Sequence, residues 1–141
     1  MTVSALTFPL LAMLLWGLAP ILGKLGLVRL DPYTALTIRT VVIAFILVGY
    51  GLVTGKLGSM AQVDWKSAGF IAGEGILASL LGHLAYFYAL KYGESSRVVP
   101  MIAAFPAVTW LAAIVIAGEK FAWDKLLGVI VILIGILIIK R

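Results

Sequence analysis

The chain has 141 residues, of which 63% are apolar and 12% are charged, with a formal net charge of +5. The apolar residues come in runs of about twenty, long enough to cross a bilayer, so the composition excludes a soluble domain and indicates an integral membrane protein. The absence of cysteine excludes disulfides and thiolate metal sites, and a single histidine with scattered carboxylates forms no recognisable metal cluster. We therefore expect no metal and no cofactor. The basic residues stand singly at the ends of apolar runs, where they signal topology rather than a nucleic-acid patch.

The first predicted transmembrane helix covers residues 7–24. It lacks the basic start of a signal peptide, and its small residues offer no good cleavage site because Pro20 follows them directly. Pro20 predicts either a kink with a freed backbone carbonyl or the winding down of the helix near its end. For Lys24 we favour snorkelling to the interface over a substrate role.

The second predicted helix covers residues 33–53. Asp31 and Pro32 precede it, a pairing typical of an N-cap followed by proline in the first turn. Arg39 then lies about 9 Å inside the helix. Its side chain either snorkels to the interface or presents a fixed positive charge to a polar cavity.

The third predicted helix, residues 67–90, carries Glu74 and the only histidine, His83. Nine α-helical residues turn the chain through about 900°, so these two side chains are expected on opposite faces, about 13 Å apart along the axis. Ser79 and Tyr86 are expected on the His83 face, although Tyr86 is also placed where an ordinary interfacial aromatic would be. Partners of Glu74 and His83 must therefore come from elsewhere.

Glu74 is the central candidate for function. An ionisable group inside a membrane span costs roughly 2.5–3.5 kcal/mol or more unless it faces protein or water. Desolvation raises the pKa of a carboxyl group and a nearby cation lowers it, so a proton and a substrate can compete for one carboxyl. The alternative is a protonated Glu74 that only donates a hydrogen bond to a neighbouring carbonyl.

The fourth predicted helix, residues 95–117, contains Pro100 and Pro106, which together predict a bend with exposed carbonyls. In the hairpin that follows, Glu119 is expected to tie down helix ends rather than bind substrate. The fifth predicted helix, residues 125–139, has no polar side chain between its flanks. The sequence thus predicts one all-α integral membrane domain, residues 1–141, with five transmembrane helices.

Several positions share their order and spacing with a known family. They are Trp16-Gly17, Lys24, Pro32, Arg39, Gly82, Tyr86, Ala89-Leu90-Lys91, Pro106, Gly118-Glu119, Gly128 and Gly135. The pattern resembles the EamA-type domains of the drug/metabolite transporter superfamily, in the half-length branch of bacterial/archaeal transporters. The resemblance implies one half of an inverted-repeat transporter that exports or exchanges a small metabolite or drug-like solute. It also implies a multi-pass protein of a prokaryotic plasma (inner) membrane.

Five helices cannot easily enclose a two-sided pathway alone, and transporters are commonly built from inverted repeats. We therefore expect a second copy of the chain in the antiparallel orientation. Four of the eleven basic residues flank the side of the N-terminus, and the other seven, Arg39 included, lie toward the opposite side. This small bias is compatible with insertion in both orientations. An inverted copy would bring Glu74 to the depth of His83 in its partner.

The predicted substrate and proton pathway comprises Glu74, His83, Ser79, Tyr86, Arg39, Trp16 and Pro106. The expected partners are a small-molecule substrate, the lipid bilayer and a second copy of the chain. The alternative function is a noncatalytic membrane subunit that requires a different five-helix partner. An enzyme is not expected, because the sequence shows no nucleophile–base pair, metal cluster or phosphate-binding loop.

Overall fold

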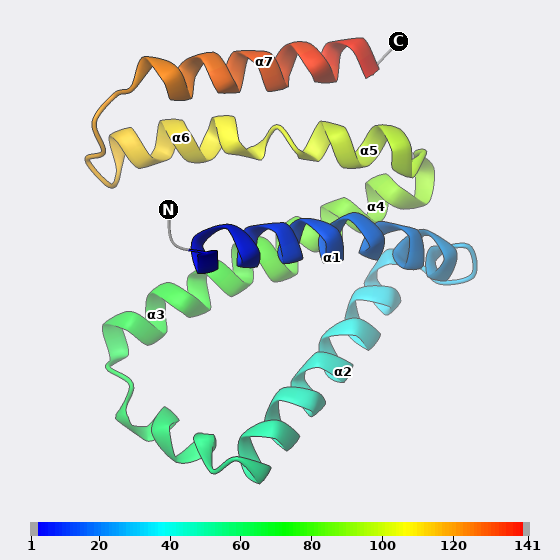
Figure 1. The fold of residues 1–141 in the computed structure, drawn as a ribbon. Helices are drawn as coiled ribbons and strands as arrows, with labels where there is room; N and C mark the ends of the chain where they lie inside the picture. The colour runs from blue at the N-terminus through cyan, green and yellow to red at the C-terminus, as the bar shows by residue number, and fades with distance from the viewer. Residues whose placement is uncertain (1–2, 140–141) are drawn as a thin grey trace. The chain divides into compact units, whose positions relative to one another are not determined.

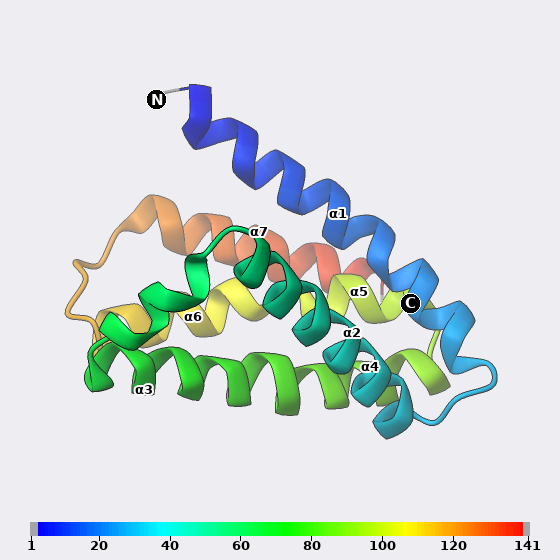
Figure 2. The same ribbon diagram turned by 90° about the horizontal axis from the view of Figure 1, so that it is seen from below.

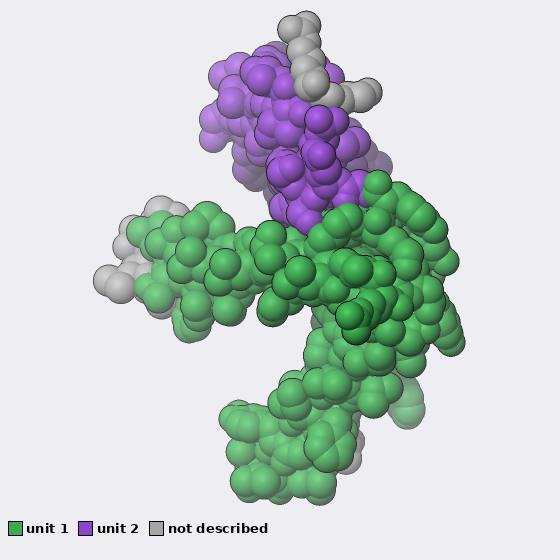
Figure 3. Space-filling view, turned by 90° about the vertical axis from the view of Figure 1, so that its right-hand side faces the viewer, with its two compact units in different colours: residues 1–92 green, residues 93–141 purple. Residues whose placement is uncertain are grey.

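The computed structural model describes residues 3–139, and within them the chain is helical and has no β-strand (Figure 1). The elements are α1 (Val3–Leu27), α2 (Pro32–Val53), the 3₁₀-helix η1 (Lys56–Gln62), α3 (Trp65–Glu74), the π-helix η2 (Gly75–Gly82), α4 (His83–Tyr92), α5 (Ser95–Ile102), α6 (Phe105–Val115) and α7 (Trp123–Ile139). The chain divides into two compact units, residues 1–92 and residues 93–141 (Figure 3).

Four stretches of the described residues are long and apolar enough to cross a membrane. They are Leu6–Leu27, Pro32–Val53, Trp65–Tyr92 and Ser95–Val115, and they coincide with the first four predicted spans. The fifth predicted span is helical as well. It forms α7, whose 17 residues are at the short end of the roughly 17–25 that a membrane helix needs. The prediction of an all-α membrane protein is confirmed at this level.

In the first unit, α4 packs against both α1 and α2. Among the described residues of this unit, the buried core side chains Leu27, Leu36, Phe87 and Leu90 gather at one end of the three helices. At this end α2 lies close to α4. The continuous helical stretch of α3, η2 and α4 diverges from α2 toward η1 (Figure 1). Full burial of such a side chain contributes about 1.5–3 kcal/mol, so this end holds the unit together.

Side-chain caps set the starts of α2 and α3. Asp31 has an extended backbone and accepts a hydrogen bond from the Thr34 N–H at 3.0 Å, with Pro32 as the first helical residue, which confirms the predicted start. Asp64 accepts from the Ser67 N–H at 2.9 Å. Hydrogen bonds from the side chain and then the backbone of Thr34 lower the pKa of Asp31 below its ordinary value. Those from Ser67 lower the pKa of Asp64 in the same way.

The second unit contains the predicted proline bend. The helix breaks after Ile102 and resumes at Phe105, with Pro106 in the first turn of α6. Because proline has no N–H, Pro106 cannot donate to the carbonyl four residues earlier. Glu119 accepts a hydrogen bond from Lys125 at 3.2 Å, and this ion pair ties the loop to the first turn of α7, as predicted.

Candidate functional site

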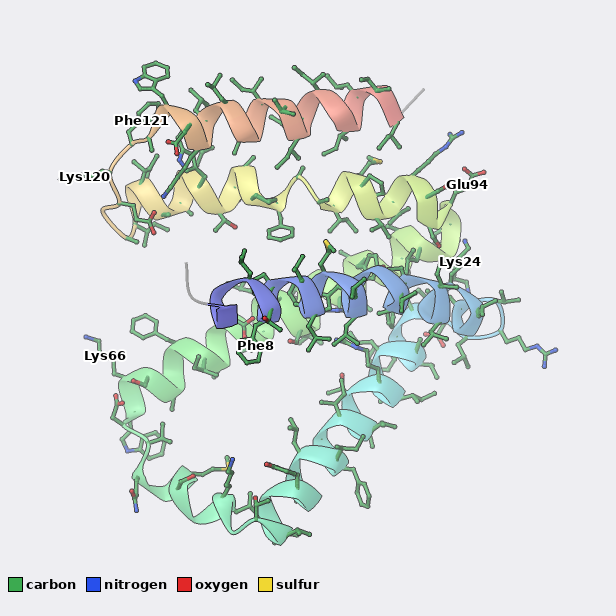
Figure 4. The ribbon with its side chains drawn as sticks, in the orientation of Figure 1. Phe8, Lys24, Lys66, Glu94, Lys120 and Phe121 are labelled. Carbon is green, nitrogen blue, oxygen red and sulfur yellow. The ribbon has the colours of Figure 1, made fainter. Side chains whose placement is uncertain are left out.

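Two lysines hold the ends of α1 and α4 together. The Lys24 ammonium donates to the carbonyl of Leu90 at 2.5 Å, and the Lys91 ammonium donates to the carbonyl of Leu30 at 2.6 Å. Longer contacts of 3.4 Å join Lys24 to the carbonyl of Lys91 and Lys91 to the carbonyl of Leu27. Figure 4 shows Lys24 at this end of α1.

We call this reciprocal arrangement the lysine clamp. The last carbonyls of a helix have no partner within the helix, and they form the negative end of its macrodipole. Each ammonium therefore compensates the end of the neighbouring helix. Lys24 is a capping residue that fixes α1 against α4, rather than the freely snorkelling side chain that the sequence suggested.

Beyond the buried core, each of the three packed helices carries one candidate residue a turn away from a buried one. Arg39 and His83 are half-buried, whereas Trp16 is exposed. Trp16 lies one turn from the buried Pro20 on α1, Arg39 one turn from Leu36 on α2, and His83 one turn from Phe87 on α4. Measured along its own helix from the clamped end, at about 1.5 Å per residue, Trp16 lies about 16 Å, Arg39 about 10 Å and His83 about 13 Å away. We call Trp16, Arg39 and His83, together with Tyr86, the level site.

Arg39 contributes a fixed cation to the level site. Its side chain is half-buried, and within residues 3–139 it makes no hydrogen bond and no ion pair. A guanidinium stays protonated at any physiological pH, so a half-buried one calls for an anionic partner.

The backbone carbonyl of Trp16 lacks the donor that an α-helix normally supplies. Pro20 follows four residues later in a continuous helix and has no N–H to donate to that carbonyl. The Pro20 ring is buried in the packed end of α1, so the helix does not end there. The Trp16 side chain itself is 72% exposed, which leaves its indole free to contact a ligand, a lipid or another chain.

His83 is held in one orientation. Its Nδ1 lies 2.9 Å from the carbonyl oxygen of Ala78, which can only accept, so Nδ1 carries the proton and Nε2 of the neutral ring is an acceptor. The rings of Tyr86 and Phe87 pack edge-on against the imidazole at 6.1 and 6.3 Å between centroids. The structure thus brings His83 and Tyr86 together on one face, as predicted.

The relation between Glu74 and His83 differs from the prediction. All eight residues that separate them, Gly75–Gly82, form a π-helix within one continuous helical stretch (Figure 2). Hydrogen bonds from i to i+5 widen the turn to roughly 4.4 residues, or about 80° per residue. Nine such steps make about two full turns, whereas α-helical steps would have left the side chains on opposite faces. Each π-helical residue turns the chain less than an α-helical one, so this segment turns Glu74 toward the His83 face from the opposite placement that α-helical geometry had predicted.

Gly82 fits this π-helical geometry. A Cβ added to it would lie 3.0 Å from the carbonyl oxygen of Leu77, five residues earlier, whereas a Cβ on Gly75 would meet nothing within 4 Å. Ser79, also predicted for the pathway, lies exposed inside the π-helix, and Glu74 is exposed with no hydrogen bond or ion pair among the described residues. Pro106 belongs to the second unit.

The π-helix and the lysine clamp are the two features that sequence reasoning missed. The third span is rich in glycine, and a non-α segment bounded by Gly75 and Gly82 could have been suspected from this composition. The clamp had a weaker signal, namely a lysine in the last turn of each of two helices. Among the described residues, no cluster of three His, Asp or Glu side chains could hold a metal ion.

Comparison with known proteins identifies the family. Residues 3–141 match the model of the EamA-like transporter family. The chain belongs to this family. An uncharacterised transporter encoded in the cobO 3′ region of Sinorhizobium sp. is 30% identical over 123 residues, which cover 87% of this chain and 86% of that protein. The EamA resemblance inferred from the sequence is thereby confirmed, and the protein is a membrane transporter by family.

Two further relatives differ in length and description. The probable 4-amino-4-deoxy-L-arabinose-phosphoundecaprenol flippase subunit ArnF of Erwinia tasmaniensis is 35% identical over 85 residues, 59% of this chain and 65% of that protein. An uncharacterised transporter of Archaeoglobus fulgidus is 29% identical over 119 residues, which cover 84% of this chain but only 42% of that protein. No solved structure matches the chain.

Proposed function

We propose that this EamA-family protein is a secondary transporter that exports or exchanges a small metabolite or drug-like solute as an antiparallel homodimer. The proposal is carried by the level site together with the π-helix, which turns Glu74 toward the His83 face. Within the described residues, Arg39 and Glu74 are unpaired charges on helices suited to crossing a membrane. Such charges mark substrate and ion pathways in membrane proteins. Relatives from bacteria and archaea support a prokaryotic plasma membrane.

The match with the archaeal relative supports the pairing of two copies. This chain aligns with less than half of that longer protein, as a single unit would align with a protein built from two. Inverted repeats place the substrate site at the interface of the two halves. In this proposal, an inverted second copy supplies the half that one chain lacks.

Glu74 is the proposed coupling residue. In the inverted dimer, Glu74 of one copy lies at the depth of His83 of the other, because each is nine residues from its own end of the span Trp65–Tyr92. A protonated Glu74 can donate to Nε2 of that histidine, which is an acceptor in the neutral ring. Ser79 and Tyr86 would line the same pathway.

Proton flux in proteoliposomes tests this function. The purified protein is reconstituted with an internal pH-sensitive dye, and amino acids, sugars and organic cations are added in turn under an imposed pH gradient. At least one class should accelerate dye quenching, and Glu74→Gln should reduce that acceleration by at least about tenfold. Ser67→Ala, which alters the same helix outside the level site, is the control. A response that survives Glu74→Gln would contradict coupling through this carboxyl, and no response to any class would contradict the transporter.

The second candidate is a noncatalytic membrane subunit that folds only with a different five-helix partner. One relative is described as a flippase subunit, and this favours the alternative. Purification of the chain alone separates the two. A stable homodimer that binds small solutes supports the transporter, and an aggregate rescued by co-expression of another five-helix chain supports the subunit.

A further inference from the structure

We infer that Arg39 of one copy and Glu74 of an inverted second copy form an ion pair across the dimer interface. The inference rests on the antiparallel homodimer of the proposed function and adds the counter-charge of the carboxylate. It starts from two opposite charges that have no partner among the described residues. Both lie in the same compact unit.

The two charges cannot pair within one chain. Arg39 is seven residues from the start of α2, about 10 Å from the clamped end. Glu74 lies beyond the whole of α4 and the π-helix, about 24 Å from that end. An ion pair needs its nitrogen and oxygen within about 4 Å, and the difference of about 14 Å in depth prevents it.

An inverted copy removes that difference. Glu74 is nine residues from Trp65, where its span begins, so it lies about 13 Å from the opposite end of the helix. Inversion exchanges the two ends, and Glu74 of the second copy then lies within about 3 Å of the depth of Arg39. The π-helix turns this carboxylate toward the His83 face of the helix, and His83 belongs to the level site. A parallel copy would leave the two charges as far apart in depth as they are in one chain.

Arg39 fits the ionised carboxylate better than the other basic groups at this end do. His83 already has Nδ1 engaged with the Ala78 carbonyl, and in the neutral ring that leaves Nε2 as an acceptor. Lys24 and Lys91 donate to the carbonyls of the clamp. The guanidinium has five donors and stays charged, so it can hold a carboxylate in a low-dielectric site. Two symmetry-related pairs would form in each dimer.

Charge reversal tests the ion pair. Each variant is expressed in cells with two different fluorescent labels. Dimer formation in their membranes is measured by energy transfer between the two labels. Arg39→Glu and Glu74→Arg, introduced singly, should each weaken dimerisation by at least about tenfold. The combination of both substitutions in one chain should restore it to within about threefold of the original. The matched control combines Arg39→Glu with Glu94→Arg, which has the same net charge but changes the exposed Glu94–Arg97 pair instead, and it should not restore dimerisation.

Cysteine cross-linking tests the same contact without reversing charges. One copy carries Arg39→Cys and a differently tagged copy carries Glu74→Cys, so one of the two ion pairs stays intact and holds the dimer. A short bifunctional maleimide should join the two tags, and should join them much less with Phe70→Cys, one turn nearer the helix start, in place of Glu74→Cys. The chain has no native cysteine to interfere.

The outcomes separate this inference from the function on which it rests. Suppose that the chain dimerises and adopts both orientations in the membrane, but that the double reversal gives no rescue and no cross-link forms. This result would overturn the ion pair and leave the antiparallel transporter standing. A single orientation of all copies would overturn both. Rescue together with the specific cross-link would establish the pair.

Discussion

The two ends of the helices in the first unit treat their polar groups differently. At the clamped end, apolar side chains from α1, α2 and α4 are buried. The lysine clamp supplies donors to the carbonyl of Leu90 near the end of α4, and to those of Leu27 at the end of α1 and Leu30 just beyond it. Toward the opposite end, α3 and the π-helix have no buried residue, and Glu74 is exposed without a described partner. The carbonyl groups at the clamped end have donors within the chain, whereas the opposite end carries a charge that is costly in lipid. We therefore expect a second protein surface to cover Glu74 at that end.

The strongest way to break this contrast is to remove one ammonium of the clamp. Lys24→Met keeps the apolar stem and leaves the carbonyl of Leu90 without its donor, and we expect a loss of about 1.5–3 kcal/mol in the free energy of unfolding. Thermal unfolding in detergent, followed by circular dichroism, measures it. The exposed Lys66→Met is the control and should change stability by less than about 0.5 kcal/mol. Equal effects of the two substitutions would show that the clamp contributes nothing.

A milder substitution tests the π-helix, which lies toward the other end. Gly82→Ala places a Cβ 3.0 Å from the Leu77 carbonyl, so the π-helix must shift, and we expect a loss of about 1 kcal/mol. The shift would also turn Glu74 away from the His83 face and weaken the cross-link between Arg39→Cys and Glu74→Cys. Gly75→Ala, in the same π-helix but with open space around the new Cβ, is the matched control. Identical cross-linking in both variants would contradict the role assigned to the π-helix.

The smallest expected effect concerns the cap of α2 at the clamped end. Hydrogen bonds from Thr34 lower the pKa of Asp31 in the folded state, so the stability they provide is present above the ordinary pKa and is lost as the pH falls through the lowered value, below about pH 4. Asp31→Asn keeps an N-cap but removes this titration. Unfolding midpoints measured at pH 6 and at about pH 3 should therefore fall less for Asp31→Asn than for the original protein. An equal fall would assign the acid sensitivity to other groups.

Most of the fold could be predicted from the sequence because its signals are local. Apolar run lengths give the spans, Asp31 followed by Pro32 gives the start of α2, and the two prolines of the fourth span give its break. Gly55 and Gly118, in predicted turns, are the glycines with positive φ in the described part of the chain. Each of these features depends on a few neighbouring residues.

The candidate site was only partly predictable, for a physical reason. Arg39, Glu74 and His83 stand out because charged or titratable groups are costly in apolar spans. The angle between Glu74 and His83 depends on the helix type, and α- and π-helical hydrogen bonding place the second residue about half a turn apart after nine steps. The clamp depends on contacts between residues more than sixty positions apart, which no local pattern encodes.

The antiparallel arrangement is the central claim, and the orientation of the chain in intact cells tests it most directly. A single cysteine at Ser59, which lies exposed in η1, is labelled with a membrane-impermeant maleimide before and after permeabilisation. Val28→Cys, in the exposed loop at the other end, serves as the paired probe. The account predicts that about half of the protein is labelled from outside at each position. Complete labelling at one position and none at the other would show a single orientation, and would contradict both the antiparallel dimer and the Arg39–Glu74 pair.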